Sequence, residues 1–147
     1  MRILLALALA CPTLAMAKDD DAPPPAPVNS CSGGKVFDDS KAECVDPKNS
    51  SLERDEIYLA VRQLAYAGRY LDAQEVMKAL PEGDPGRLTY MGFTHRKLGN
   101  LDLAMMYYRD AIAKDPANIA ARSYMGQGFV TEGRMDEAKE QLALIRQ

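Results

Sequence analysis

The sequence predicts an all-α fold in which about three helix hairpins follow one another as repeats. Three glycines reveal the period, because Gly68, Gly99 and Gly133 recur at nearly equal intervals along the chain. Self-similarity at this spacing is typical of stacked helical repeats. Apolar residues also recur at helical spacing before and after each glycine. With 147 residues, the chain has the length of one such domain plus shorter flanking segments.

The composition limits the classes of function. The chain carries 18 basic and 21 acidic residues, a formal net charge of −3, and 47% apolar residues. A slightly acidic chain presents no basic field to a phosphate backbone, so we expect no nucleic-acid partner. This mixed composition favours a soluble helical domain and names no substrate.

Residues 1–17 have the pattern of a signal peptide. Arg2 supplies a positive charge, an apolar stretch runs to Leu14, and the Ala-Met-Ala of residues 15–17 offers small residues where a signal peptidase cleaves. The apolar stretch is too short for a permanent membrane anchor, which needs about 20 residues. We therefore expect a periplasmic or secreted protein. The alternative is an envelope lipoprotein in which Cys11 is the lipid-bearing first residue.

The next segment, residues 18–30, is predicted to be a disordered linker. It contains four of the nine prolines in the chain, preceded by acidic residues. Proline donates no backbone hydrogen bond, and this stretch has no apolar pattern from which to build a core.

Residues 31–50 are predicted to form a small hairpin held by a disulfide. Cys31 and Cys44 are the cysteines that remain after cleavage, and an even pair in an exported chain indicates one disulfide. Turn residues separate two short strands, expected at about 35–37 and 42–45. Because an isolated hairpin is only marginally stable in water, we interpret the disulfide as a structural staple.

The remaining residues, 51–147, are assigned to three repeats, each interpreted as two antiparallel helices. The repeats are expected at about 53–84, 85–118 and 119–147. In the first repeat, Ser50 caps the first helix in a capping box with Glu53, and Gly68 ends it in a left-handed conformation. The other expected helices cover about 70–80, 86–98, 101–114, 116–131 and 135–146.

Small residues recur where the two helices of a pair must approach closely. Gly92 and Ala104 occupy these places in the second repeat, and Gly126 and Ala138 occupy them in the third. A larger side chain in such a contact would overpack it. The residues expected to fill the space beside these contacts are Tyr108 and Leu142.

This array resembles the tetratricopeptide repeat family over about residues 53–147. The family pattern is W-x2-L-G-x2-Y…A-x3-F…P, and it recurs with a period of about 34 residues. The second repeat follows it with Leu88, Met91-Gly92, His95, Ala104, Tyr108 and Pro116. The third has Arg122 in the place of the Trp and ends before a closing proline, and in the first repeat Val61 replaces the glycine. The resemblance implies a right-handed superhelix whose first helices line a concave, peptide-binding groove.

Carried onto this chain, the resemblance places nine residues in the groove. They are Tyr58, Arg62, Tyr66, Tyr90, Phe93, Arg96, Lys97, Tyr124 and Gln127. Aromatic rings beside guanidinium groups suit a peptide that is partly acidic and partly apolar. The alternative is that several of these tyrosines belong to the repeat core and the arginines to a solvated face. The Lys and Asn of carboxylate-clamp repeats are absent, since Tyr58, Arg62 and Tyr90 occupy the comparable places.

The sequence shows no catalytic or metal-binding constellation. The single histidine, His95, has no Cys, Asp or Glu grouped with it at ligand spacing, and it stands where the family has an aromatic packing residue. A nucleophile elbow and a phosphate-binding glycine loop are also missing from the sequence. We therefore predict a non-enzymatic protein that uses no cofactor and no metal.

The predicted function is that of an adaptor in the bacterial cell envelope, with protein or peptide partners. The alternative is an outer-membrane or periplasmic lipoprotein that acts as an assembly factor for a pilus or secretion machine, contacting the membrane only through lipid on Cys11. The last helix turns Ala143 and Leu144 away from its inner face, whereas terminal repeats need a polar outer face. We therefore hypothesise that this end meets a second copy or another protein.

Overall fold

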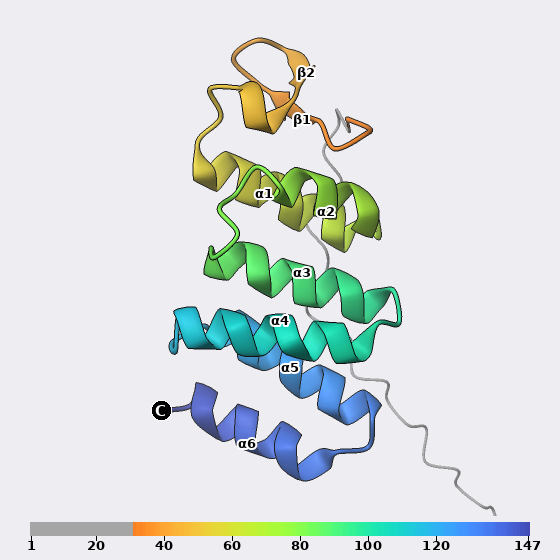
Figure 1. Cartoon of the computed structure of the whole chain (residues 1–147), viewed down its shortest axis with the longest axis vertical. Helices are drawn as coiled ribbons and strands as arrows, with labels where there is room; N and C mark the ends of the chain where they lie inside the picture. Colours follow the sequence, from red (N-terminus) through yellow and green to blue (C-terminus); the bar gives the residue numbers. More distant parts are fainter. Residues whose placement is uncertain (1–30) are drawn as a thin grey trace, which may run out of the picture.

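The computed structural model describes residues 31–147, so the expected signal peptide (1–17) and linker (18–30) lie outside the described residues. A small hairpin is followed by stacked helices, which Figure 1 shows from the hairpin at the top to α6 at the bottom. The elements are β1 (Val36–Asp38), β2 (Glu43–Val45), the 3-10 helix η1 (Pro47–Asn49), α1 (Arg54–Tyr66), α2 (Tyr70–Met77), α3 (Pro85–Lys97), α4 (Leu101–Lys114), α5 (Ile119–Thr131) and α6 (Met135–Ile145). The helices pack as three consecutive pairs, and successive pairs stack on one another. The predicted all-α array of helix hairpins is confirmed. Within residues 31–147, no helix is both long and apolar enough to span a membrane.

Each helix pair turns at one of the three periodic glycines. Gly68, Gly99 and Gly133 have φ of +77°, +85° and +73°, in the left-handed region that residues other than glycine rarely adopt. The residue after each glycine donates its N–H to the carbonyl five residues earlier, at 2.9 Å in all three turns. This arrangement satisfies carbonyls that the helix end would otherwise leave unpaired. The period in the sequence is therefore a period of helix ends.

The helix boundaries differ slightly from the predicted ones. α2 ends at Met77 rather than near Leu80, because the N–H groups of residues 78–80 bond to carbonyls three residues earlier, in a tighter turn before Pro81. α5 begins at Ile119 rather than at Pro116, because Asn118 is the N-cap and accepts a hydrogen bond from the Ala121 N–H at 2.9 Å.

The predicted cap of the first helix is wrong by three residues. α1 begins at Arg54, and Glu53 rather than Ser50 is its N-cap. The Glu53 N–H donates to the Glu56 carboxylate at 2.7 Å. Ser50 instead accepts a hydrogen bond from the N–H of Leu52 at 3.4 Å, in the segment between η1 and α1.

The close approach predicted for the second repeat is confirmed. A Cβ added at Gly92 would lie 2.5 Å from the Tyr108 ring and 3.1 Å from the Ala104 carbonyl oxygen. Ala104 and Tyr108 are both fully buried. Gly92 therefore leaves the space that the Tyr108 ring occupies between α3 and α4.

The third repeat does not reproduce this packing. A Cβ added at Gly126 would make only ordinary contacts, 3.7 Å from the Gln141 Cβ and 3.8 Å from the Ala138 carbonyl oxygen. The prediction that Leu142 fills this space is also wrong, because its exposed fraction is 46%. Among residues 31–147, no helix lies on this side of α5 and α6 in the way that α5 lies on α3 and α4.

The N-terminal hairpin covers the first repeat. β1 and β2 pair in antiparallel orientation, with Phe37 opposite Cys44. β1 starts at Val36, one residue later than predicted. The Cys31–Cys44 disulfide is present, with its Cα atoms 5.8 Å apart. Val36 joins the hydrophobic core, and Arg69 donates to the Cys31 carbonyl at 2.5 Å.

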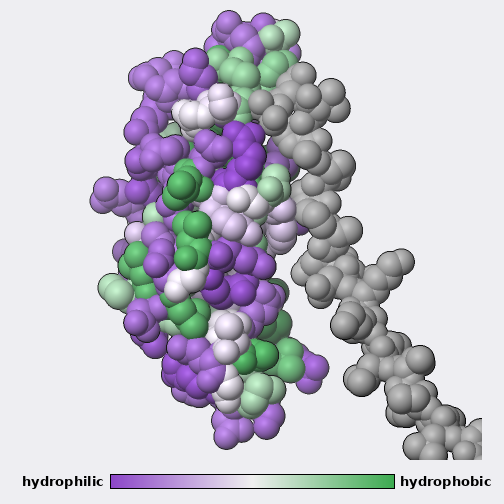
Figure 2. Space-filling view, turned by 90° about the vertical axis from the view of Figure 1, so that its right-hand side faces the viewer, coloured by the Kyte–Doolittle hydropathy of each residue, from purple (hydrophilic) through white to green (hydrophobic). Residues whose placement is uncertain are grey.

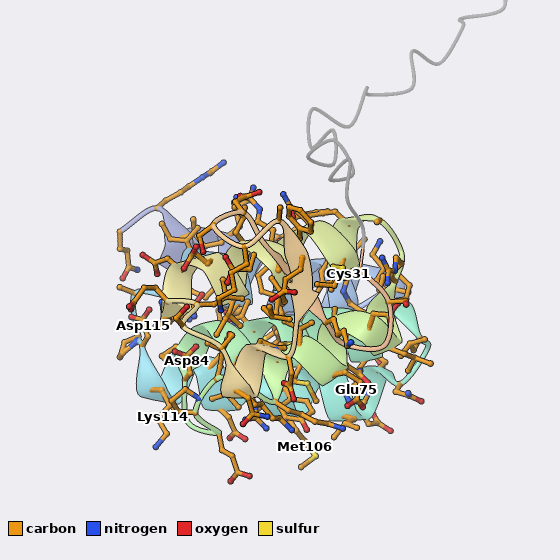
Figure 3. The ribbon with its side chains drawn as sticks, turned by 90° about the horizontal axis from the view of Figure 1, so that it is seen from above. Cys31, Glu75, Asp84, Met106, Lys114 and Asp115 are labelled. Carbon is orange, nitrogen blue, oxygen red and sulfur yellow. A yellow bond between two sulfur atoms is a disulfide. The ribbon has the colours of Figure 1, made fainter. Side chains whose placement is uncertain are left out.

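The hairpin meets the first repeat along one edge of the molecule. Seen from above in Figure 3, Cys31 and Glu75 lie on one edge, whereas Asp84 and Asp115 lie on the opposite edge, at the connections between repeats. A Cβ at Gly34 would clash with the Glu75 Cβ at 2.7 Å, so the hairpin backbone lies directly against α2.

Candidate functional site

The first helices of the three repeats, α1, α3 and α5, contact one another in order and form one face, which we call the first-helix face. All nine predicted groove residues are on these helices. Tyr90 and Tyr124 hold the same position in successive repeats. Helix stacking therefore brings residues from three distant parts of the chain onto one surface.

The aromatic residues of this face form a continuous cluster. The Tyr58 and Tyr90 rings are 5.5 Å apart in an edge-to-face arrangement. Phe93 lies between the other two tyrosines, with ring centroids 5.7 Å from Tyr66 and 5.0 Å from Tyr124. Aromatic pairs in such geometries contribute about 0.5–1.5 kcal/mol beyond their buried area.

The structure divides these aromatic residues by depth. Tyr90, Phe93 and Tyr124 are buried, with exposed fractions of 3%, 4% and 9%. Tyr58 and Tyr66 are partly exposed. The buried three form the floor of the first-helix face, and the other two are nearer to its surface.

Burial sets the protonation of the phenols. Desolvation raises the pKa of Tyr58, Tyr90 and Tyr124 above the usual phenol value, and it raises the pKa of Tyr108 to about 12. For Tyr124, the hydrogen bond between its hydroxyl and that of Tyr66 raises the pKa further. These four phenols therefore stay protonated to a higher pH than an ordinary tyrosine.

Besides Arg54, which lies 5.8 Å from the Tyr58 ring centroid and pairs with Asp84, three cations lie beside the cluster. The Arg62 guanidinium lies 5.7 Å from the Tyr66 ring centroid, and Arg96 and Lys97 lie 5.7 and 5.6 Å from that of Phe93. Arg96 also donates to the Gln127 side chain at 2.9 Å. Within residues 31–147, no carboxylate forms an ion pair with any of the three cations. The face thus keeps a positive character over an aromatic floor.

One contact between repeats was missed by sequence reasoning. Arg54 Nε donates a hydrogen bond to the Asp84 carboxylate at 2.8 Å, and Nη2 of the same guanidinium forms an ion pair with it at 2.8 Å. The same buried carboxylate caps α3 by accepting from the Arg87 N–H at 2.8 Å. The pair joins the first repeat to the start of the second. The Asp-Pro at the start of α3 indicates a cap, but nothing in the sequence pairs it with a residue 30 positions away.

His95 packs against α4. Its ring stacks on Tyr107 with centroids 5.5 Å apart, and it is partly buried. Desolvation lowers its pKa. Within residues 31–147, no group of three or more His, Cys, Asp or Glu side chains is placed to hold a metal ion.

A second surface lies at the turns inside the repeats. Figure 2 faces these turns and shows apolar residues interspersed with polar ones. Leu71 and Leu98 are exposed there and line a hollow of about 410 Å³ beside Gly68. This hollow shares none of the nine predicted groove residues.

The fold and this face define a helical-repeat protein whose first helices present aromatic rings surrounded by cations. No family model matches the chain, and no solved structure matches it. The chain is similar to the Cellulose synthase 1 operon protein C of Komagataeibacter xylinus, with 28% identity over 117 residues. That similarity covers 71% of this chain and 9% of the longer protein. The chain thus spans less than a tenth of its relative.

Proposed function

We propose that the protein is a non-catalytic interaction module of the tetratricopeptide type in the bacterial cell envelope. Its first-helix face binds a protein segment that carries both acidic and apolar side chains. The observation that carries this proposal is the group formed by Arg62, Arg96 and Lys97 around the aromatic cluster, without ion-pair partners among residues 31–147.

The chemistry of this face selects the ligand class. Guanidinium groups form charge-assisted hydrogen bonds to carboxylates, and partly exposed tyrosines supply apolar contact with a polar edge. Because Tyr90, Phe93 and Tyr124 are almost entirely buried, the ligand contacts Tyr58, Tyr66, the three cations and Gln127 above them. The protein then recognises the ligand by shape and charge on this surface, and no covalent bond is made or broken.

The proposed location follows from the disulfide. Such bonds persist in oxidising compartments, and the Cys31–Cys44 bond supports an exported protein. The alternative role, as an accessory to an envelope assembly machine, is favoured by the similarity to a protein named for a cellulose synthase operon.

The test is affinity capture from the envelope of the producing bacterium. The native protein is compared with a variant carrying Arg62→Gln, Arg96→Gln and Lys97→Gln. A control with Lys35→Gln, Lys48→Gln and Arg109→Gln removes the same charge from exposed positions elsewhere. We expect a partner that the native protein and the control retain and the first variant loses. Equal recovery by all three proteins would move the binding site away from the first-helix face.

A further inference from the structure

An open hollow, lined mainly by apolar residues, lies between the two C-terminal helices. The hollow between α5 and α6 measures about 290 Å³. Its apolar and small lining residues are Ser123, Gly126, Val130, Met135, Ala138, Leu142 and Ile145. We call this hollow the α5–α6 slot. It lies at the lower end of the array in Figure 1, where no other described element covers it.

The corresponding surface one repeat earlier is occupied by a helix. Val130, Met135 and Lys139 lie one repeat period after Arg96, Leu101 and Met105. α5 lies on those three residues, and a Cβ at Gly128 would clash with the Met105 methyl group and lie 3.3 Å from Leu101 and 3.5 Å from Arg96. The α5–α6 slot therefore repeats a surface that accepts a helix within the same molecule.

The slot exposes residues whose counterparts one repeat earlier are more buried. Leu142 has an exposed fraction of 46%, whereas its counterpart Tyr108 has 0%. Met135 has an exposed fraction of 50%, whereas its counterpart Leu101 is partly buried against the core. Covering such apolar side chains removes apolar surface from water, which is favourable. A helix with an apolar stripe would supply that cover.

Charge determines which helix fits. The lining includes the cations Arg122 and Lys139 and no carboxylate. Arg122 is held by the Pro116 carbonyl at 3.0 Å, and Lys139 pairs only with the fully exposed Asp136 at 3.2 Å. Exposed pairs of this kind contribute little, so Lys139 is available to another carboxylate. A second copy docked slot to slot would bring like charges together, which disfavours it.

We propose that the α5–α6 slot binds an amphipathic helix of a partner protein that carries acidic residues beside its apolar stripe. Of the nine groove residues of the first-helix face, only Gln127 also lines the slot. The helix takes the pose that α5 takes against α3 and α4. Its carboxylates meet Lys139 and Arg122, and its apolar stripe covers Met135 and Leu142.

The probe is a lactam-bridged helical peptide with the α5 sequence, residues 118–131, bearing Glu in the places of Arg122 and Gln127. These two places flank the buried stripe of α5. A matched peptide carries Gln at both. Binding is measured by calorimetry, and its location by NMR shifts of the methyl groups of Met135, Leu142 and Ile145. We expect the acidic peptide to bind about tenfold more tightly than the Gln peptide and to shift these methyl groups.

Variants of the protein complete the test. Lys139→Glu should weaken binding of the acidic peptide by about tenfold, whereas Lys48→Glu in η1 should leave it unchanged. The variant lacking the Arg62, Arg96 and Lys97 charges should bind the peptide normally, which separates this inference from the proposed function. Equal affinity for both peptides, or shifts confined to the first-helix face, would overturn the inference. A dimer detected by sedimentation, in which α6 is buried and the peptide no longer binds, would also overturn the inference.

Discussion

The Tyr66 and Tyr124 hydroxyls are hydrogen-bonded at 2.7 Å, although the residues are 58 positions apart. The bond joins the first repeat to the third beside the ring of Phe93, which belongs to the second. In most repeat arrays each unit contacts only its neighbours. Here side chains of all three repeats meet on the first-helix face.

Removing this bond should destabilise the protein. Tyr66→Phe deletes one hydroxyl and leaves that of Tyr124 without its partner, which costs about 1–2 kcal/mol. Urea unfolding measures the change. Tyr107→Phe is the control, because Tyr107 lies outside the aromatic cluster and stacks on His95. An equal loss in both variants would contradict a specific role for the bond.

Two glycines at the same repeat position should respond differently to alanine. Gly92→Ala forces a Cβ against the Tyr108 ring and should lower the free energy of unfolding by about 1–3 kcal/mol. Gly126→Ala has room, and its better helix propensity should raise stability by up to about 1 kcal/mol. Thermal unfolding of the two variants, side by side, checks both signs. A loss at Gly126 as large as at Gly92 would show that α5 and α6 pack as tightly as α3 and α4.

Reducing the disulfide should loosen the N-terminal end first. Its cysteines are 13 positions apart, and closing a loop of about 15 residues contributes about 3 kcal/mol in the chain-entropy model. Hydrogen exchange in α2 should then accelerate, because the hairpin backbone lies against Glu75. A Cys31→Ser, Cys44→Ser variant should show the same exchange with and without reductant. Unchanged protection of α2 after reduction would mean that the hairpin covers the repeat without its staple.

Stability should fall in mild acid through His95. Desolvation lowers the pKa of His95 in the folded protein, so the folded state binds fewer protons than the unfolded chain, whose histidine has a pKa of about 6.5. The stabilising contribution is therefore complete above about pH 6.5 and is lost as the pH falls toward the lowered folded value. The urea midpoint between about pH 7.5 and 5.5 should drop more for the native protein than for His95→Phe. Parallel curves for the two proteins would assign the dependence to other groups.

The sequence predicted the turns and the helix that carries each groove residue, but it did not predict how deeply each side chain is buried. Gly68, Gly99 and Gly133 marked the turns, because a left-handed conformation is a local requirement that glycine meets. The nine groove residues were placed on the correct helices, since α1, α3 and α5 carry all of them. Their exposure was not predictable in the same way. Tyr90 and Tyr58 look alike in sequence, yet Tyr90 is enclosed on both sides by neighbouring repeats and Tyr58 is covered on one.

The same limit explains the error at Leu142. It holds the place of Tyr108 in the repeat pattern, and the pattern predicts a core residue there. Tyr108 is buried because the third repeat stacks on the second, whereas Leu142 lies in the α5–α6 slot. A repeat motif describes one unit, and burial depends on the unit beside it.

By itself, the sequence determined the all-α repeat architecture, the glycine turns inside the repeats and the disulfide partners, because each of these depends on local conformation or on a short loop. Only the tertiary structure decided that the slot between the last two helices is open and which aromatic rings form the floor of the first-helix face. The burial of those rings depends on contacts between repeats, such as the hydrogen bond between Tyr66 and Tyr124, 58 positions apart, which no local preference encodes.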